Sequence, residues 1–222
     1  MTNLQEFQVS GHAGELHARL WQPSSTPRAL VFILHGYAEP GGRYAHVAEA
    51  LAAADLAVLA SDHVGHGLSG GERALITDFG LVVNDLNAVI SEAVNRLDPD
   101  IPLLLAGHSM GGLLAARFVQ RWPDRAIGAA FFGAVIGDWK WAREVLELPE
   151  LPPEDSDPMG MSRDIDVCRD YDADPLVYRG LYKRPLLEAE VIALDNFRDE
   201  IDRIEIPVGF FHGTAAPFVP YE

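Results

Sequence analysis

Short apolar runs alternate with longer amphipathic stretches along most of the chain. This alternation predicts an α/β protein, in which strands of a sheet are connected by helices. The first two runs mix polar and apolar residues, as an exposed antiparallel edge does, whereas the later ones are almost continuously apolar, as parallel strands buried on both faces are. The predicted strands are residues 6–9, 15–21, 30–34, 56–60, 101–106, 127–132 and 206–211.

Four stretches between these strands carry apolar residues at helical spacing. Such a stripe packs one side of a helix onto a sheet. Pro123 ends the third stretch, because proline cannot continue a helix. The predicted helices are residues 44–54, 86–97, 110–122 and 187–204.

Residues 138–203 interrupt the alternation. They contain no convincing strand, and 147–158 is rich in proline, glutamate and aspartate. A connection of this length is too long for a plain crossover. It predicts a helical cap over the carboxyl edge of the sheet, where open α/β sheets bind ligands. The predicted division is a core of residues 1–137, a cap of 138–204 and a last core strand within 205–222.

Composition narrows the class of protein. The 222 residues include 33 acidic and 17 basic ones, and the net charge of −16 disfavours binding to nucleic acid. The single cysteine, Cys168, excludes an internal disulfide and a cysteine-based zinc site, and we expect it to be a packed cap residue. Since neither a signal peptide nor a run of about 18 apolar residues is present, we expect a cytoplasmic globular protein.

The segment Gly107-His108-Ser109-Met110-Gly111 follows the fifth predicted strand and opens a helix. This is the G-x-S-x-G pattern in the strand-turn-helix context that gives it meaning. The turn is too sharp for side chains at the two flanking positions. Ser109 would then stand at a helix N-terminus, where developing negative charge is favoured, and the Met110 amide would supply one oxyanion donor.

A second segment, His35-Gly36-Tyr37, ends the strand 30–34. In this fold the loop after that strand supplies the other oxyanion donor, for which the Tyr37 backbone N–H is our candidate. His35 either holds the loop by hydrogen bonds or transfers protons, and we favour the scaffold role.

Together these segments resemble the monoacylglycerol lipase family. Residues 35–44 (HGYAEPGGRY) resemble its H-G-x-x-E-x-x-x-R-Y loop, and residues 62–69 (DHVGHGLS) its D-H-x-G-H-G-x-S segment. Residues 107–112 (GHSMGG) are similar to its nucleophile elbow. In the predicted cap, residues 162–164 and 174–177 are also similar to family segments.

The resemblance implies an α/β-hydrolase with a helical lid. Such an enzyme needs no cofactor and cleaves carboxylic esters of glycerol and fatty acids through an acyl-enzyme. It implies Ser109 as the nucleophile and the Tyr37 and Met110 amides as the oxyanion hole. The residues that support these motifs are His35, Gly36, Gly107, His108 and Gly111.

The resemblance gives no role to His63 and His66. In the glycine-rich loop after the fourth predicted strand, their imidazoles either order the loop by hydrogen bonds or form a metal site with Asp62. That ligand set is incomplete, and we expect no metal.

The acid and the base of a catalytic triad are missing from the expected positions. A serine hydroxyl needs a histidine to take its proton and an acid to orient that histidine. Residues 212–220 (HGTAAPFVP) resemble the family segment H-G-T-x-D-x-x-x-P, with Ala216 at the aspartate position. The histidine should follow a further helix and strand of about 20 residues, but only six residues follow Ala216. Asp138 is an alternative acid, or else the N-cap of a cap helix.

Three explanations of this double absence stay open. The chain is incomplete, with a C-terminal strand and helix of the fold missing and position 216 altered; or it is an inactive form; or its function needs no triad. We favour the first, because ending at Glu222 uncovers an apolar strand edge. The rival function is that of a non-catalytic α/β-hydrolase-like binding protein.

An apolar group in the predicted cap is the candidate for substrate binding. It would either admit a fatty chain while the cap docks transiently on a membrane or micelle surface, or merely pack the cap onto the sheet. The expected partner is a small lipid ester, and the pattern indicates no oligomeric state. The candidate substrate-binding residues are Trp139, Trp141, Leu146 and Leu148.

Overall fold

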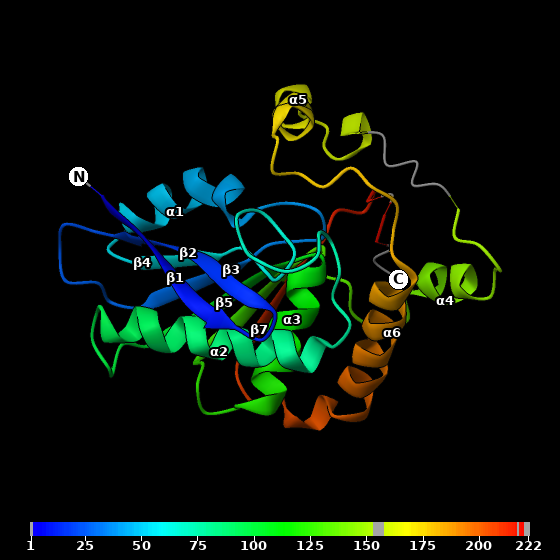
Figure 1. Ribbon diagram of the computed structural model, residues 1–222. Coiled ribbons are helices and arrows are strands. Elements are labelled where there is room, and N and C mark those ends of the chain that lie inside the picture. Colours follow the sequence, from blue (N-terminus) through cyan, green and yellow to red (C-terminus); the bar gives the residue numbers. More distant parts are fainter. Residues whose placement is uncertain (1, 153–157, 217, 220–222) are drawn as a thin grey trace.

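A seven-stranded sheet lies at the centre of the computed structural model, which describes residues 2–152, 158–216 and 218–219 (Figure 1). The strands are β1 (Asn3–Gly11), β2 (Gly14–Gln22), β3 (Leu30–Leu34), β4 (Ala57–Ser61), β5 (Leu103–His108), β6 (Gly128–Phe132) and β7 (Val208–Phe211). They lie in the order β1-β2-β4-β3-β5-β6-β7. The pairs β1–β2 and β2–β4 are antiparallel and the other pairs are parallel. The predicted α/β class with a mostly parallel sheet is confirmed.

The burial of the strands follows the hydrophobic pattern. Every residue of β3 and β4 is buried, as expected for central parallel strands covered on both faces. Each predicted strand is present; β3 has the predicted ends, and at least one end of every other strand is displaced by one to three residues. The largest displacement is in β1, which begins at Asn3 because its pairing with β2 continues through polar residues as far as Gln22.

Helices cover the two faces of the sheet unequally. The helices of the first part of the chain are η1 (Gly41–Tyr44), α1 (Ala45–Ala52), α2 (Phe79–Asn95) and α3 (Met110–Arg121). Both α2 and α3 pack against the larger apolar cluster, whereas α1 covers a smaller one that includes Trp21, Val31 and Val58.

Some helices begin or end at residues other than those that the apolar pattern predicts, and at α2 a polar capping residue is the reason. We expected a helix from residue 86, but α2 begins at Phe79. The Asp78 carboxylate accepts the N–H groups of Gly80 at 2.7 Å and Leu81 at 3.2 Å, and it thereby caps the helix about two turns earlier. The expected helix 44–54 is preceded by the short 3-10 helix η1 and ends at Ala52.

Between β6 and β7 the described residues form helices and no strand. These helices are α4 (Lys140–Leu146), η2 (Pro158–Gly160), α5 (Ile165–Ala173), α6 (Arg184–Asp199) and η3 (Ile201–Arg203). Figure 1 shows α5 projecting from the body, whereas α6 packs against α2 and α3 and buries Leu186 and Phe197 in their core. Part of the predicted cap, residues 153–157, lies outside the described residues. The division into core and cap stays a prediction.

The described sheet ends at β7 in an apolar edge. Phe210 is 63% and Phe211 55% exposed, although the Phe211 ring stacks on Phe132 with 4.9 Å between centroids. The carboxyl end of β7 is fixed beside β6 by a hydrogen bond of 2.8 Å from the Gly133 N–H to the Phe211 carbonyl. The loop after β7 therefore begins at the same sheet edge as the loops after β5 and β6.

One carboxyl group is buried in α6 without an opposite charge. Glu190 is 3% exposed and accepts no hydrogen bond from the residues that the structure describes. Burial raises its pKa to about 8 from an ordinary value of 4.5. Between these two values the folded protein binds one more proton than the unfolded chain, so stability falls as the pH rises from 4.5 to 8.

Replacing Glu190 by glutamine should remove this loss. We expect Glu190→Gln to raise the melting temperature at pH 8 and to change it little at pH 5, as followed by thermal unfolding at both pH values. Glu188→Gln, an exposed position on the same helix, is the matched control and should leave the pH dependence as it is. An equal pH dependence in Glu190→Gln and the unmodified protein would contradict this account.

Candidate functional site

Ser109 lies in the sharp turn between β5 and α3. Its φ of 54° is in the left-handed region, which a non-glycine residue adopts only when its surroundings enforce it. Three backbone hydrogen bonds do so. The Ser109 N–H donates to the Phe132 carbonyl at 3.1 Å, and the Ser109 carbonyl accepts the N–H groups of Gly112 at 2.9 Å and Val135 at 3.1 Å.

The glycines around Ser109 sit where no side chain fits. A Cβ on Gly107 would lie 2.5 Å from the Gly111 carbonyl oxygen. A Cβ on Gly111 would lie 2.2 Å from the Leu34 carbonyl oxygen and 2.5 Å from that of His35. The start of α3 is therefore packed directly against the end of β3, and this contact brings the two sequence motifs together.

Gly36 lies beside Ser109 in the loop after β3. A Cβ on Gly36 would be only 3.1 Å from the Ser109 Cβ. The His35 Nδ1–H donates to the Gly36 carbonyl at 2.7 Å. Because a peptide unit is planar, this bond also fixes the direction in which the Tyr37 N–H points.

Three buried histidines, His35, His63 and His66, pack together next to this loop. The centroids of the His35 and His63 rings are 3.9 Å apart. The His63 backbone N–H donates to His35 Nε2 at 2.9 Å, so this nitrogen carries no proton and the His35 proton is on Nδ1. The His63 Nε2–H in turn donates to the His35 carbonyl at 3.1 Å, and the His66 Nδ1–H donates to the Val64 carbonyl at 3.0 Å.

The histidine cluster is neutral near pH 7. Burial, with the neighbouring histidines acting in the same direction, lowers the pKa of His35 and His63 well below 6.5. Burial also lowers the pKa of His66 to about 4. A protonated His35 would lose the acceptor that holds the His63 N–H, so the neutral form is the one that fits this structure.

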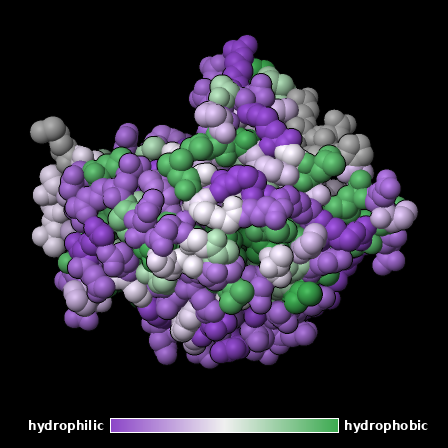
Figure 2. Space-filling view, viewed as in Figure 1, coloured by the Kyte–Doolittle hydropathy of each residue, from purple (hydrophilic) through white to green (hydrophobic). Residues whose placement is uncertain are grey.

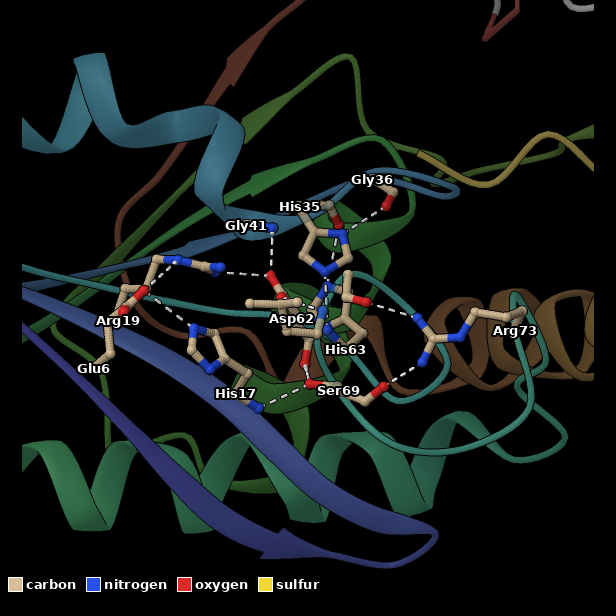
Figure 3. A network of polar contacts seen from close by, with 12 residues as sticks. Glu6, His17, Arg19, His35, Gly36, Gly41, Asp62, His63, Ser69 and Arg73 are labelled. Carbon is tan, nitrogen blue, oxygen red and sulfur yellow. Dashed lines mark hydrogen bonds and ion pairs between the residues drawn. The ribbon is translucent and has the colours of Figure 1, made fainter. Parts of the chain in front are cut away.

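Asp62 joins three segments around the same loop (Figure 3). Its carboxylate is fully buried and accepts Arg19 Nη1 at 3.1 Å, the Gly41 N–H at 2.7 Å and the Leu68 N–H at 2.8 Å. The Ser69 hydroxyl donates to the Asp62 backbone carbonyl at 2.6 Å. These bonds connect β2, the start of η1 and the loop after β4 to one buried charge, which has an opposite charge beside it.

A second buried carboxylate, Glu39, lies between the loop and the elbow. Its Oε1 accepts the Gly36 N–H at 3.0 Å, the Tyr44 hydroxyl at 2.8 Å and His108 Nδ1 at 3.1 Å. Burial alone would raise the pKa of Glu39, but the hydrogen bond and charge of His108, together with Gly36 and Tyr44, hold it below the ordinary value. Glu39 thus ties Gly36 to the residue that precedes Ser109.

Neither candidate acid position, 138 or 216, forms a hydrogen bond with the Ser109 hydroxyl, and neither does His212, the histidine nearest the end of the chain. Ala216 follows β7, and its N–H donates to the Gly213 carbonyl at 3.1 Å. His212 is exposed, and the Asp138 carboxylate pairs with Arg143 Nε at 3.4 Å. No side chain in the described part of the chain forms a hydrogen bond with the Ser109 hydroxyl. Pro217 and Pro220 of the same family-like segment lie outside the described residues.

The four candidate substrate-binding residues lie on or beside α4. Trp139 and Trp141 contact each other with ring centroids 5.2 Å apart. Arg184 donates to the carbonyls of Leu146 at 2.9 Å and Leu148 at 2.5 Å, and it thereby fastens the end of α4 to α6.

Two pockets lie outside the immediate surroundings of Ser109. One of about 310 Å³ is lined by Ala38, His66 and the segment 175–179. The other, of about 550 Å³, lies between α2, α3 and α6. The described residues contain no group of three or more histidine, cysteine, aspartate or glutamate side chains placed to hold a metal ion.

Glu39, Tyr44 and Asp62 match motif positions in the sequence, where Asp62 is considered only as a metal ligand, but the structure places all three in the network that holds the loop. One feature of the sequence indicates that the two carboxylates, Asp62 and Glu39, are buried and hydrogen-bonded. Asp62 directly follows an apolar strand and Glu39 follows another within five residues, and a carboxylate entering the core at such a point needs donors. Their partners could not be read from the sequence, because Arg19 and His108 come from distant segments.

Comparison with known proteins places these motifs in a family. Residues 25–222 match the family model Hydrolase_4, described as serine aminopeptidase, S33. The chain is 32% identical over 210 residues to a Mycolicibacterium smegmatis protein named monoacylglycerol lipase, and the alignment covers 90% of this chain and 75% of that protein.

Solved structures agree with this result. A monoacylglycerol lipase of Paleococcus ferrophilus is 26% identical, with a TM-score of 0.75 over 99% of this chain and 80% of that one. A soluble variant of the monoglyceride lipase of Saccharomyces cerevisiae, in complex with a substrate analog, has a TM-score of 0.80 over 99% of this chain and 79% of that one. Its identity of 18% makes that likeness one of fold alone.

A side chain at Gly111 should disrupt the contact between α3 and β3. We expect Gly111→Ala to lower the free energy of unfolding by about 2 kcal/mol or more, because the added Cβ collides with backbone that cannot move aside. Urea unfolding measures this value. Gly213→Ala is the control, since its Cβ would meet no atom within 4 Å. Similar stabilities of the two variants would contradict the tight turn.

The neutral histidine cluster should make the protein sensitive to mild acid. Each folded-state pKa is lower than the unfolded value near 6.5, so the unfolded chain binds more protons below pH 6.5. The contribution of these rings to the free energy of unfolding should therefore be fully present above pH 6.5. It should fall as the pH drops toward 4, by about 1.4 kcal/mol per pH unit for each ring.

Urea unfolding between pH 7 and 5 tests this acid sensitivity in a Glu190→Gln background, where the opposite effect of Glu190 is removed. His66→Gln should reduce the slope by about one proton. His46→Gln, at an exposed position of α1, should not change it. A slope that is the same in both variants would show that His66 is not held neutral by the fold.

Proposed function

We propose a function for this chain on the premise of its family: it belongs to the serine aminopeptidase S33 family and is a monoacylglycerol lipase-like serine hydrolase. The proposed function is hydrolysis of monoacylglycerols or similar lipid esters through an acyl-enzyme on Ser109. The observation that carries this proposal is the strained turn that holds Ser109 between β5 and α3, in contact with the loop after β3.

The proposed reaction begins with attack of the Ser109 hydroxyl oxygen on the ester carbonyl carbon. The ester C–O bond then breaks, the hydroxyl proton leaves with the alcohol, and water releases the acid from the acyl-enzyme. During the attack, negative charge develops on the carbonyl oxygen and requires donors that are already in place. The Met110 N–H is the first amide of α3, so it has no acceptor within the helix and lies at the positive end of the helix dipole. The Tyr37 N–H is the second proposed donor.

The direction of the Tyr37 N–H is supported by the buried histidines. His35 holds the Gly36 carbonyl, which belongs to the same peptide unit as the Tyr37 N–H. His63 keeps His35 in the tautomer that donates from Nδ1. In this proposal His35 is a positioning residue with no part in proton transfer.

Proton transfer is the step that the described residues support least. No described side chain accepts a hydrogen bond from the Ser109 hydroxyl, Ala216 has no ionisable group, and Asp138 is paired with Arg143. Asp138 as a substitute acid therefore has no geometric support. We expect acyl transfer by this chain to be slow, at roughly the 10³–10⁴-fold advantage over water that oxyanion donors and substrate binding give without a triad.

The proposed substrate has an apolar acyl chain that contacts the cap. Trp141 is 38% and Leu148 46% exposed beside the buried side chains of α4, and Figure 2 shows apolar patches among hydrophilic residues below the projecting α5. We propose that this side of the molecule docks transiently on a lipid surface. A net charge of −16 disfavours anionic lipid, so the surface should be a neutral one. Among the described helices none is both long and apolar enough to cross a bilayer.

Labelling with a fluorophosphonate tests the nucleophile directly. We expect the probe to phosphonylate Ser109 with loss of fluoride, and Ser109→Ala to take up no probe and to lose its monoacylglycerol hydrolysis. Mass spectrometry of intact protein and of peptides identifies the labelled residue. Ser91→Ala is the control, since that hydroxyl donates to the Asn87 carbonyl on α2. Hydrolysis that survives in Ser109→Ala would refute the proposed role.

Ala216 favours a second candidate, a hydrolase-like protein that binds a lipid ester without cleaving it. This candidate predicts that the unmodified protein takes up no fluorophosphonate but still quenches its tryptophan fluorescence when a monoacylglycerol is added. Labelling of Ser109 together with turnover would exclude it.

A further inference from the structure

A row of aromatic rings connects the cap to the loop after β3. The Tyr37 ring stacks on Tyr182, with centroids 4.7 Å apart and planes 16° from parallel. Tyr182 also contacts Trp141 of α4 at 5.3 Å, and Trp141 contacts Trp139 at 5.2 Å. The row Tyr37–Tyr182–Trp141–Trp139 therefore runs from the candidate oxyanion residue to the candidate acyl-binding residues.

The backbone follows the same connection. The Tyr178 N–H donates to the Ala38 carbonyl at 2.8 Å, and the Tyr178 ring meets the edge of Tyr37 at 6.3 Å. The segment before α6 thus touches the loop through one backbone bond and two rings. Figure 1 places this segment between the projecting α5 and α6, the helix that packs against α2 and α3.

The two sides of Tyr37 are held by different partners. Its peptide unit is held from the core, through His35 and the Gly36 carbonyl. Its side chain is held from the cap, through the stack on Tyr182. An aromatic pair contributes about 0.5–1.5 kcal/mol beyond the burial of its surface. Loss of the stack would leave the Tyr37 ring with only edge contacts, to Tyr178 at 6.3 Å and to His66 at 5.9 Å, among the ring contacts that the structure shows for it.

We propose that Tyr182 is a positioning residue that holds the Tyr37 amide in place and couples the cap to it. This inference rests on the proposed function, in which that amide stabilises the oxyanion. Movement of α4 on contact with an acyl chain displaces Trp141, and the Tyr182 ring passes this displacement to Tyr37. The cap then influences the reaction at Ser109 as well as the selection of the acyl chain.

Two fluorophosphonates distinguish positioning from substrate contact. A methyl fluorophosphonate is too short to reach the cap, whereas a dodecyl fluorophosphonate extends into it. We expect Tyr182→Leu to slow phosphonylation of Ser109 by both probes about tenfold, in the maximal rate more than in the half-saturating concentration. Tyr182→Phe keeps the ring and should react like the unmodified protein, as should the control Leu181→Ala, which alters the exposed neighbour.

Hydrogen exchange provides a readout that does not depend on reaction. Peptides covering residues 35–40 should exchange faster in Tyr182→Leu than in Tyr182→Phe. Trp141→Leu, a partly exposed position, should slow both probes by a smaller factor, and it replaces Tyr182→Leu if that variant does not fold.

The outcomes separate the two proposals. Slowing of the dodecyl probe alone would make Tyr182 a substrate contact and overturn its positioning role. A labelled unmodified protein with equal rates in Tyr182→Leu and Tyr182→Phe would overturn it as well, while the proposed function stands. An unmodified protein that takes up neither probe would overturn the proposed function, and the positioning role with it.

Discussion

The close approach of α3 to β3 is the constraint on which the rest of the candidate site depends. Gly111 lies so near the Leu34 and His35 carbonyl oxygens that a Cβ would stand 2.2 Å and 2.5 Å from them. This contact sets the end of one parallel strand against the start of the helix that follows its neighbour. It places Gly36 beside Ser109, although 73 residues separate the two in the chain. A side chain at Gly111 or at Gly36 would separate Ser109 from the loop after β3.

Holding that loop requires polar groups inside an apolar core, and the two carboxylates and the histidines are accommodated there in different ways. Asp62 has a cation and two amide donors, so its charge is compensated where it is buried. Glu39 has three donors around one oxygen. The histidines stay neutral because burial disfavours their charge and because a backbone N–H occupies His35 Nε2. The same loop is therefore fixed by two buried charges and by one tautomer.

The sequence was informative where one pattern had one physical cause. Continuous apolar runs predicted β3 and β4, and G-x-S-x-G after a strand predicted the turn at Ser109. It was less informative where partners come from distant segments. The start of α2 depends on a capping carboxylate eight residues before the predicted apolar stripe, and the stack of Tyr37 on Tyr182 joins positions 145 residues apart. Hydrophobic periodicity indicates which face of a helix or strand is buried, but it does not indicate which residues that face contacts.

Charge stabilisation and proton transfer are separable in this molecule. The strain at Ser109, of the order of 1–3 kcal/mol for a residue in this backbone region, is kept by hydrogen bonds from β6 and α3 that do not involve a triad. Position 216 nevertheless follows β7 at the same sheet edge, one strand beyond the β6 carbonyl that binds the Ser109 N–H. Alanine at this position supplies no ionisable group. The proposed oxyanion donors lie on α3 and in the loop after β3, so they can be tested independently of the residue at position 216.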